Sequence, residues 1–190
     1  MKKCSVLFCL FAVFSFCGCS AAANDTETAD AIIARYAAAD TISADVDMIC
    51  DNDGFLQQYG MTYTYSASGE NHAVITAPEE IRGISLTYGE EVGISFDLTE
   101  LETGFSEGQG VSPADALPVL MDTLIKDNFD EVWTENSDAG AYLVLQYADE
   151  EDNISRTVYF QKDSGDLKYF EVYQQGNCLL KTEISNLSIT

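Results

Sequence analysis

The sequence predicts an α+β domain in which one long antiparallel sheet packs against one or two helices. Three observations predict it: a helical pattern of apolar residues near the start, a later change to alternating apolar and polar residues, and turn sequences between the alternating segments. The chain has 190 residues, about one domain's worth, and 46% of them are hydrophobic, which is typical of a globular protein.

The first predicted helix runs from about residue 27 to residue 39. Apolar side chains recur on one of its faces at helical spacing, and acidic residues near its start favour the positive end of the helix dipole. The residues just before it are small and polar, so residues 19–28 are predicted to form a tether.

Near residue 42 the period of the apolar residues changes to two, which indicates strands. In the second strand, for example, Met61, Tyr63 and Tyr65 share one face. Turn sequences that contain glycine, aspartate or asparagine separate the segments. The predicted strands of this half are about 42–50, 61–66, 73–77, 84–88 and 94–98.

A glycine-rich loop, residues 104–110, leads into a second predicted helix. Ser112 is suited to the N-cap and Pro113 to the first helical position. An apolar face follows over residues 117–125. Pro118 lies inside this pattern, and it should bend the helix or shift its start.

The last third of the chain, from Trp133 onward, is predicted to be an antiparallel meander. Three short connections rich in aspartate, asparagine and glycine separate its strands, as expected for tight turns. The predicted strands are about 141–148, 154–161, 167–174 and 178–185.

The N-terminus carries a targeting signal. Lys2 and Lys3 precede an apolar run, residues 6–16, that is too short to span a bilayer. The run ends in Phe16-Cys17-Gly18-Cys19, which resembles the lipobox of bacterial lipoproteins. The resemblance implies cleavage before Cys19 and attachment of lipid to its sulfur. The alternative is an ordinary cleaved secretory signal with cysteines scattered through it.

The predicted organisation is a signal peptide at 1–18, a lipidated tether at 19–28 and a single domain at 29–190. The location that follows is the extracytoplasmic face of the cell membrane, with the lipid as anchor. The formal net charge is −23, and loss of both leader lysines leaves 7 basic against 32 acidic residues, a charge of −25. So acidic a chain would repel a phosphate backbone, which argues against nucleic-acid binding.

Two cysteines remain in the predicted domain. Three of the six lie in the signal peptide, a fourth is Cys19, and Cys50 and Cys178 are left. A disulfide between these two would close a long loop and stabilise the fold by roughly 4–5 kcal/mol. Two buried free thiols are the alternative. Their spacing does not suggest a zinc site.

No motif predicts catalysis. His72 is the only histidine and stands beside a turn, and the sequence holds no nucleophile elbow, zinc-protease or phosphate-loop motif. The acidic turn at residues 51–54 lacks the ligand pattern of an EF-hand, with Ile49 and Gly60 where oxygen ligands would stand. We therefore predict a protein that is not an enzyme and that uses no metal or cofactor.

The order of elements, together with several short segments, resembles the LolA/LolB/LppX superfamily of outer-membrane lipoprotein carriers. Within it, the chain resembles especially the LolA-like lipoproteins of Gram-positive bacteria, with the germination lipoproteins of spore-forming clostridia as a close alternative. The segments that carry the resemblance are Ala77-Pro78-Glu79, Ile81-Arg82-Gly83-Ile84, Leu86-Thr87-Tyr88-Gly89, Ser112-Pro113 through Leu120, and Asp163-x-Gly165 with Leu167 and Tyr169.

The resemblance implies a strongly curved antiparallel sheet, a half-barrel, with the N-terminal and mid-chain helices packed on its concave face. Carriers of this type hold acyl chains in that hollow. The first functional hypothesis is therefore a lipoprotein that binds a lipid or another hydrophobic ligand there. The candidate lining residues are Tyr63, Tyr65, Ile84, Leu86, Phe96, Leu120 and Leu124.

The alternative hypothesis is an adaptor lipoprotein whose sheet docks a cell-envelope protein, such as a wall hydrolase. The acidic surface would favour a basic partner through long-range attraction. The two hypotheses differ in volume: a ligand binder should keep an apolar cavity of a few hundred Å³ in the hollow, on the order of known ligand pockets, whereas an adaptor should have a filled hollow.

Overall fold

The computed structural model describes residues 19–52, 54–89, 91–97, 99–102, 108–126 and 128–190. The helices are α1 (Cys19–Ala37), α2 (Ala116–Lys126) and the short 3-10 helix η1 (Glu79–Ile81). The strands of the first half are β1 (Thr41–Asn52), β2 (Phe55–Ser66), β3 (Asn71–Ala77), β4 (Ser85–Tyr88), β5 (Val92–Phe96) and β6 (Thr99–Glu102). Those of the second half are β7 (Glu131–Ser137), β8 (Gly140–Asp149), β9 (Ile154–Gln161), β10 (Leu167–Gln174) and β11 (Asn177–Ile189).

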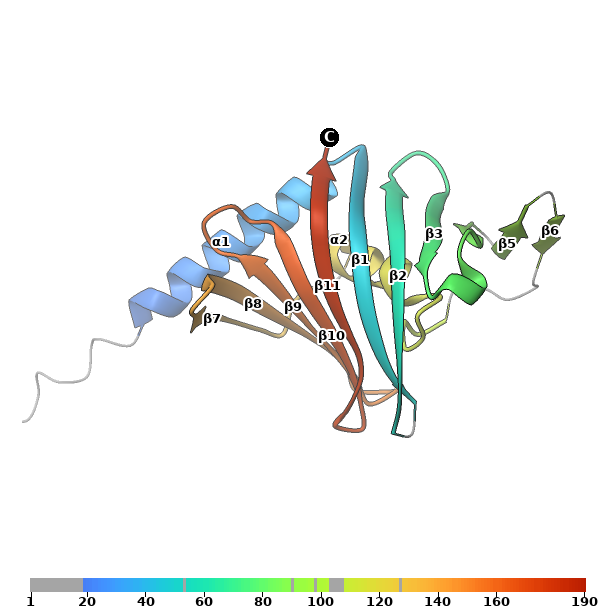
Figure 1. The fold of residues 1–190 in the computed structure, drawn as a ribbon. Coiled ribbons are helices and arrows are strands. Elements are labelled where there is room, and N and C mark those ends of the chain that lie inside the picture. Colours follow the sequence, from blue (N-terminus) through green and yellow to red (C-terminus); the bar gives the residue numbers. More distant parts are fainter. Residues whose placement is uncertain (1–18, 53, 90, 98, 103–107, 127) are drawn as a thin grey trace, which may run out of the picture.

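Over the described residues, all eleven strands form one antiparallel sheet in the order β6-β5-β4-β3-β2-β1-β11-β10-β9-β8-β7 (Figure 1). Each half is a meander of neighbouring strands. The two halves join through β1 and β11, the first and last strands, whose register runs from Ile42 opposite Ile189 to Cys50 opposite Leu180. The first and last strands of the chain are therefore paired at the centre of the sheet.

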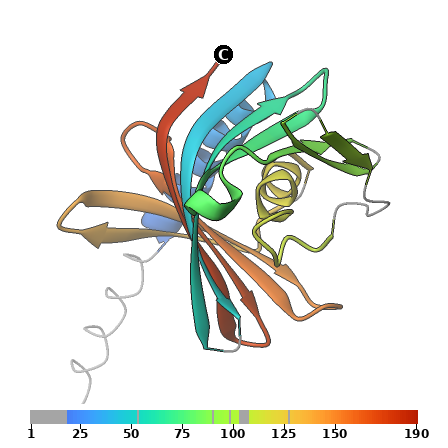
Figure 2. The same ribbon diagram turned by 45° about the vertical axis from the view of Figure 1, so that its right-hand side comes forward.

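The sheet is open and strongly curved, and it wraps around α2, which lies in its hollow (Figure 2). Helix α1 contacts α2, β7 and β8, so both helices lie on the concave face. The core sits between them and the sheet, where Phe160, Phe170 and Leu124 are fully buried. The α+β class, the curved sheet and the placement of both helices agree with the prediction.

Helix α1 begins at Cys19, earlier than predicted, so the segment expected to form a tether is helical. The helix is held near this segment, because the buried carboxylate of Asp25 contacts Lys162 and accepts a hydrogen bond from Thr134 on β7. The small polar residues of this segment, taken by themselves, predict a flexible tether. Here a distant strand supplies the partner that orders them.

Helix α2 starts at Ala116 and not at Pro113. The side chain of Asp115 organises the turn before it, accepting hydrogen bonds from the Ser112 N–H at 3.0 Å and the Ser112 hydroxyl at 2.7 Å. With this start, Pro118 falls in the first turn, where the missing N–H has no intrahelical partner to lose. Pro118 therefore shifts the start of the helix, one of the two expected effects.

Every strand of the central part of the sheet was predicted, but the two strands at its edges were not. Strands β9 and β10 have the predicted bounds, and β11 continues to residue 189. Two strands were not predicted, β6 and β7, and both are edge strands. Edge strands carry many polar side chains because they are paired on one side only, so their alternation is weak in the sequence.

Candidate functional site

The hollow of the sheet is filled where most of the candidate lining residues lie. Tyr63, Leu86, Leu120 and Leu124 are between 0 and 5% exposed, and all four belong to the core cluster. A side chain that faced an acyl-sized cavity would keep part of its surface free of contact with other protein atoms. These four keep almost none, so α2 itself packs against the inner face of the sheet at this place.

The other three candidates are arranged differently. Tyr65 and Ile84 are half-buried and pack against the edge of the core. Phe96 lies outside the core cluster and is 55% exposed, at the end of β5 beside Gly83. The structure thus brings together six of the seven residues and leaves Phe96 apart, because β5 ends near the edge of the sheet, beyond the cover of α2.

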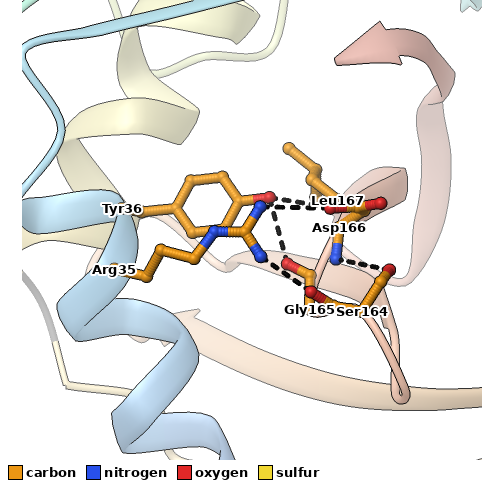
Figure 3. Close-up of polar contacts among 6 residues, drawn as sticks. All are labelled: Arg35, Tyr36, Ser164, Gly165, Asp166 and Leu167. Atoms are coloured by element: carbon orange, nitrogen blue, oxygen red, sulfur yellow. Dashed lines mark hydrogen bonds and ion pairs between the residues drawn. The ribbon is translucent and has the colours of Figure 1, made fainter. Parts of the chain in front are cut away.

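Helix α1 is attached to the turn between β9 and β10 by a set of polar contacts (Figure 3). The Tyr36 hydroxyl accepts a hydrogen bond from the Leu167 N–H at 2.8 Å and donates one to the Gly165 carbonyl at 3.3 Å. Arg35 donates to the Ser164 carbonyl at 2.7 Å and to the Asp166 carboxylate at 3.1 Å. Burial raises the pKa of Tyr36 to about 12, so the hydroxyl keeps its proton at neutral pH.

A second contact holds the beginning of α1. Lys162 Nζ lies 2.6 Å from Asp25 Oδ1, and the Thr134 hydroxyl donates to Asp25 Oδ2 at 2.8 Å. The hydrogen bond from Lys162 lowers the pKa of the Asp25 carboxyl despite its burial. Helix α1 is therefore fixed to the β7–β10 half of the sheet at Asp25 and again at its C-terminal end.

Both domain cysteines are free thiols in the structure. Cys50 packs against the core and lies opposite Leu180, whereas Cys178 lies beside Glu171 and Lys181 on the other face of the sheet. A bulge between Val172 and Tyr173 changes the side-chain direction of β11 at this point. The structure therefore has free thiols and no disulfide between Cys50 and Cys178, because the two side chains lie on opposite faces of the sheet.

The face of the sheet opposite the helices carries a groove of about 530 Å³ that runs across the strands from β2 to β7. We call it the outer groove. Three tyrosines from adjacent strands line it: Tyr142 and Tyr169 pack edge to face at 5.7 Å between ring centroids, and Tyr159 and Tyr169 at 6.4 Å. Its lining residues are Asp47, Ile49, Gln58, Glu135, Ser137, Ala139, Tyr142, Tyr159, Tyr169, Glu171, Lys181, Thr182 and Glu183.

Glu171, on β10, is the centre of a hydrogen-bond network in the outer groove. It accepts hydrogen bonds from Lys181 at 2.8 Å and from the Tyr173 hydroxyl at 2.7 Å. Burial opposes ionisation of this carboxyl, but the hydrogen bonds that it accepts and the charge of Lys181 together outweigh burial, and its pKa lies below the usual value. Burial, together with the Glu171 charge, raises the pKa of Tyr159 to about 12.

Sequence reasoning missed the outer groove because it followed the core-facing residues. The usable signal was the set of aromatic residues at outward positions of neighbouring strands, where a soluble sheet normally carries polar side chains. Tyr159 on β9 stands directly opposite Tyr169 on β10, which the alternation alone does not reveal. A search for outward tyrosines on consecutive strands would have indicated it.

Two other kinds of site were sought within the described ranges. No three His, Cys, Asp or Glu side chains there come close enough together to hold a metal ion. The described helices also include none with the length and apolar character needed to cross a bilayer.

The fold is similar to several solved structures. An uncharacterized conserved protein from Thermus thermophilus aligns with a TM-score of 0.53 and 11% identity, covering 86% of this chain and 88% of that one. A DUF1329 family protein from Desulfovibrio piger aligns with a TM-score of 0.50 and 10% identity, over 89% and 93%. A domain provisionally described as an outer membrane lipoprotein-sorting protein, from Vibrio parahaemolyticus, aligns with a TM-score of 0.50 and 13% identity, over 89% and 93%.

These likenesses concern the fold, and they confirm that the chain has a LolA-like fold. No protein-family profile and no curated protein sequence matches the chain.

Proposed function

We propose that this protein is a lipid-anchored adaptor of the cell envelope, without catalytic activity, whose sheet docks another protein. The observation that carries the proposal is the filled hollow: α2 occupies the place where a carrier would hold its ligand, and Leu120 and Leu124 are buried there in direct packing. Three tyrosines instead line the outer groove, which is open to solvent.

Anchoring follows from the N-terminal sequence. Residues 1–18 form the proposed signal peptide, and Cys19, the first residue of α1, is the proposed lipidation site. Asp25, six residues later, is already fixed to Lys162, a distance of about 9 Å along a helix. A lipid on Cys19 would therefore hold the domain close to the membrane surface on the extracytoplasmic side.

The anchor has its own test. The full-length protein should partition into the detergent phase of a Triton X-114 extraction, incorporate labelled palmitate, and lose both properties with Cys19→Ser. A Cys19→Ser protein that still partitions into detergent would contradict lipidation at this residue.

A second candidate function is the binding of a lipid in the hollow. It is supported by the fold shared with the lipoprotein-sorting domain and by the apolar residues that α2 and the sheet place inside. For a ligand to enter, α2 would have to leave the core, which exposes the leucines now buried and costs free energy in proportion to the apolar area exposed.

Native mass spectrometry of residues 20–190, purified from a lipid-containing host, separates the two functions. The adaptor proposal expects the mass of the bare chain, unchanged after incubation with phospholipid vesicles. A reproducible added mass that organic extraction removes, and that is identified as lipid, would overturn it in favour of the carrier.

A further inference from the structure

The outer groove combines aromatic surface with uncompensated negative charge. Asp47, Glu135 and Glu183 are exposed along it, and within the described ranges none of the three has an ion-pair partner. The only basic residue of its lining, Lys181, is already paired with Glu171 at 2.8 Å. The rim is therefore negative and lacks its own counter-charge.

The floor of the groove suits a cation as well. Tyr142 is buried, Tyr159 is half-buried, and Tyr169 presents 36% of its surface to solvent. Tyrosine rings attract cations over their faces, and arginine also stacks on aromatic rings while its guanidinium pairs with a carboxylate through two hydrogen bonds. Rings and carboxylates here lie within one groove, so a single arginine side chain would reach both kinds of group.

We infer that the outer groove is the docking site for a basic, arginine-bearing segment of a protein partner. The inference rests on the proposed adaptor function and adds to it the surface and the chemistry of the partner. Charge complementarity selects this occupant: a lipid tail would leave the three carboxylates facing apolar matter, and an acidic segment would be repelled. The length of the groove, across the strands from β2 to β7, suits an extended segment and not a single side chain.

The first test uses acetyl-tetra-arginine amide as the probe, titrated into residues 20–190 in 150 mM salt and followed by amide chemical shifts. The expected shift changes cluster on β8, β9, β10 and β11 around the tyrosines. Glu135→Gln with Glu183→Gln should weaken binding by about tenfold, the sum of two surface charge pairs. Tyr169→Leu should weaken it by about threefold, as expected for a solvent-exposed cation–π contact.

The matched control removes two charges elsewhere. Glu150→Gln with Glu151→Gln lies on the exposed turn between β8 and β9, at the far end of β8 from Tyr142. This variant should change the affinity by less than about twofold, because the charges lie beyond a Debye length at this salt. Equal weakening by both double variants would mean general attraction to an acidic protein and would overturn the inference.

A second test places a photo-crosslinking benzoylphenylalanine at Ser137 in the outer groove of the full-length protein in its host, with Phe55 at the β1–β2 hairpin tip as the comparison site. The inference expects a crosslink from position 137 to a peptide containing arginine, lost in the Glu135→Gln/Glu183→Gln variant and kept in Glu150→Gln/Glu151→Gln. A partner crosslinked from position 55 alone would overturn the groove assignment and leave the adaptor function standing. A lipid adduct in the native mass spectrum, with no protein crosslinked from either position, would overturn both.

Discussion

The hydroxyl of Tyr36 accepts a hydrogen bond from the backbone N–H of Leu167 at 2.8 Å, which joins α1 to a strand 131 residues away in the sequence. The same hydroxyl donates to the Gly165 carbonyl, and the ring packs edge to face on Phe160 at 5.5 Å. One side chain thus supplies both the polar and the apolar part of the contact between α1 and the sheet.

Replacing Tyr36 by Phe should lower the free energy of unfolding by about 1–3 kcal/mol, because the buried Leu167 N–H loses its partner while the ring stays in place. Urea denaturation followed by circular dichroism measures this. Tyr65→Phe is the matched control, since the Tyr65 hydroxyl has no hydrogen bond among the described residues and its loss should change stability by less than about 0.5 kcal/mol. Equal effects of the two substitutions would contradict a stabilising hydrogen bond between Tyr36 and Leu167.

The ion pair of Asp25 predicts a specific pH dependence. The pKa of this carboxyl is lowered in the folded protein, chiefly by the hydrogen bond from Lys162, so its contribution to stability is present above the unfolded value near 3.8 and is lost as the pH falls through the lower folded value. Asp25→Asn should therefore be less stable than the wild type at pH 7, and the difference should shrink below about pH 4.

Thermal unfolding of both proteins between pH 3 and pH 7 measures this difference. The exposed pair of Lys126 and Asp122 supplies the control, because Asp122→Asn should have only a small effect at any of these values. A gap between Asp25→Asn and wild type that stays constant with pH would mean that ionisation of Asp25 does not contribute.

Leu124→Ala should cost about 2–5 kcal/mol of stability, because the side chain is fully buried and α2 cannot close the space left behind. Phe96→Ala, in a residue that is mostly exposed, should cost much less, within about 1 kcal/mol. Guanidinium denaturation of the two variants compares them. A small loss for Leu124→Ala would indicate that this side chain faces open space, and the filled hollow would have to be abandoned.

The two thiols should both be titratable after unfolding, and the mass of residues 20–190 should be the same with and without a reductant. In the folded protein their alkylation at pH 7 should be slow, because burial raises the pKa of both Cys50 and Cys178 above the usual value. The rate should rise only at a pH above the range in which an ordinary thiol ionises. A gain of two mass units on reduction would show a bridge and contradict this arrangement.

Much of the fold could be predicted from local sequence patterns. Alternation over 154–161 and 167–174 located β9 and β10 within their observed bounds, because side-chain direction in a strand depends only on residue parity. The start of α2 also depends on a local contact, but one that the residue pattern does not reveal. Ser112 and Pro113 favour a helix start there, yet the Asp115 carboxylate accepts hydrogen bonds from Ser112, and the helix begins at Ala116.

The sequence by itself determined the fold class and most of the apolar set that forms the core, because these depend on composition and on the period of the apolar residues. Only the tertiary structure decided the beginning of α1, the opposite faces of the two cysteines and the outer groove. Each depends on register between segments distant in the chain: Lys162 reaching Asp25, the bulge beside Tyr173, and Tyr159 standing opposite Tyr169. Register is set by the packing of the whole sheet, and a shift of one residue would turn the same tyrosines toward the core.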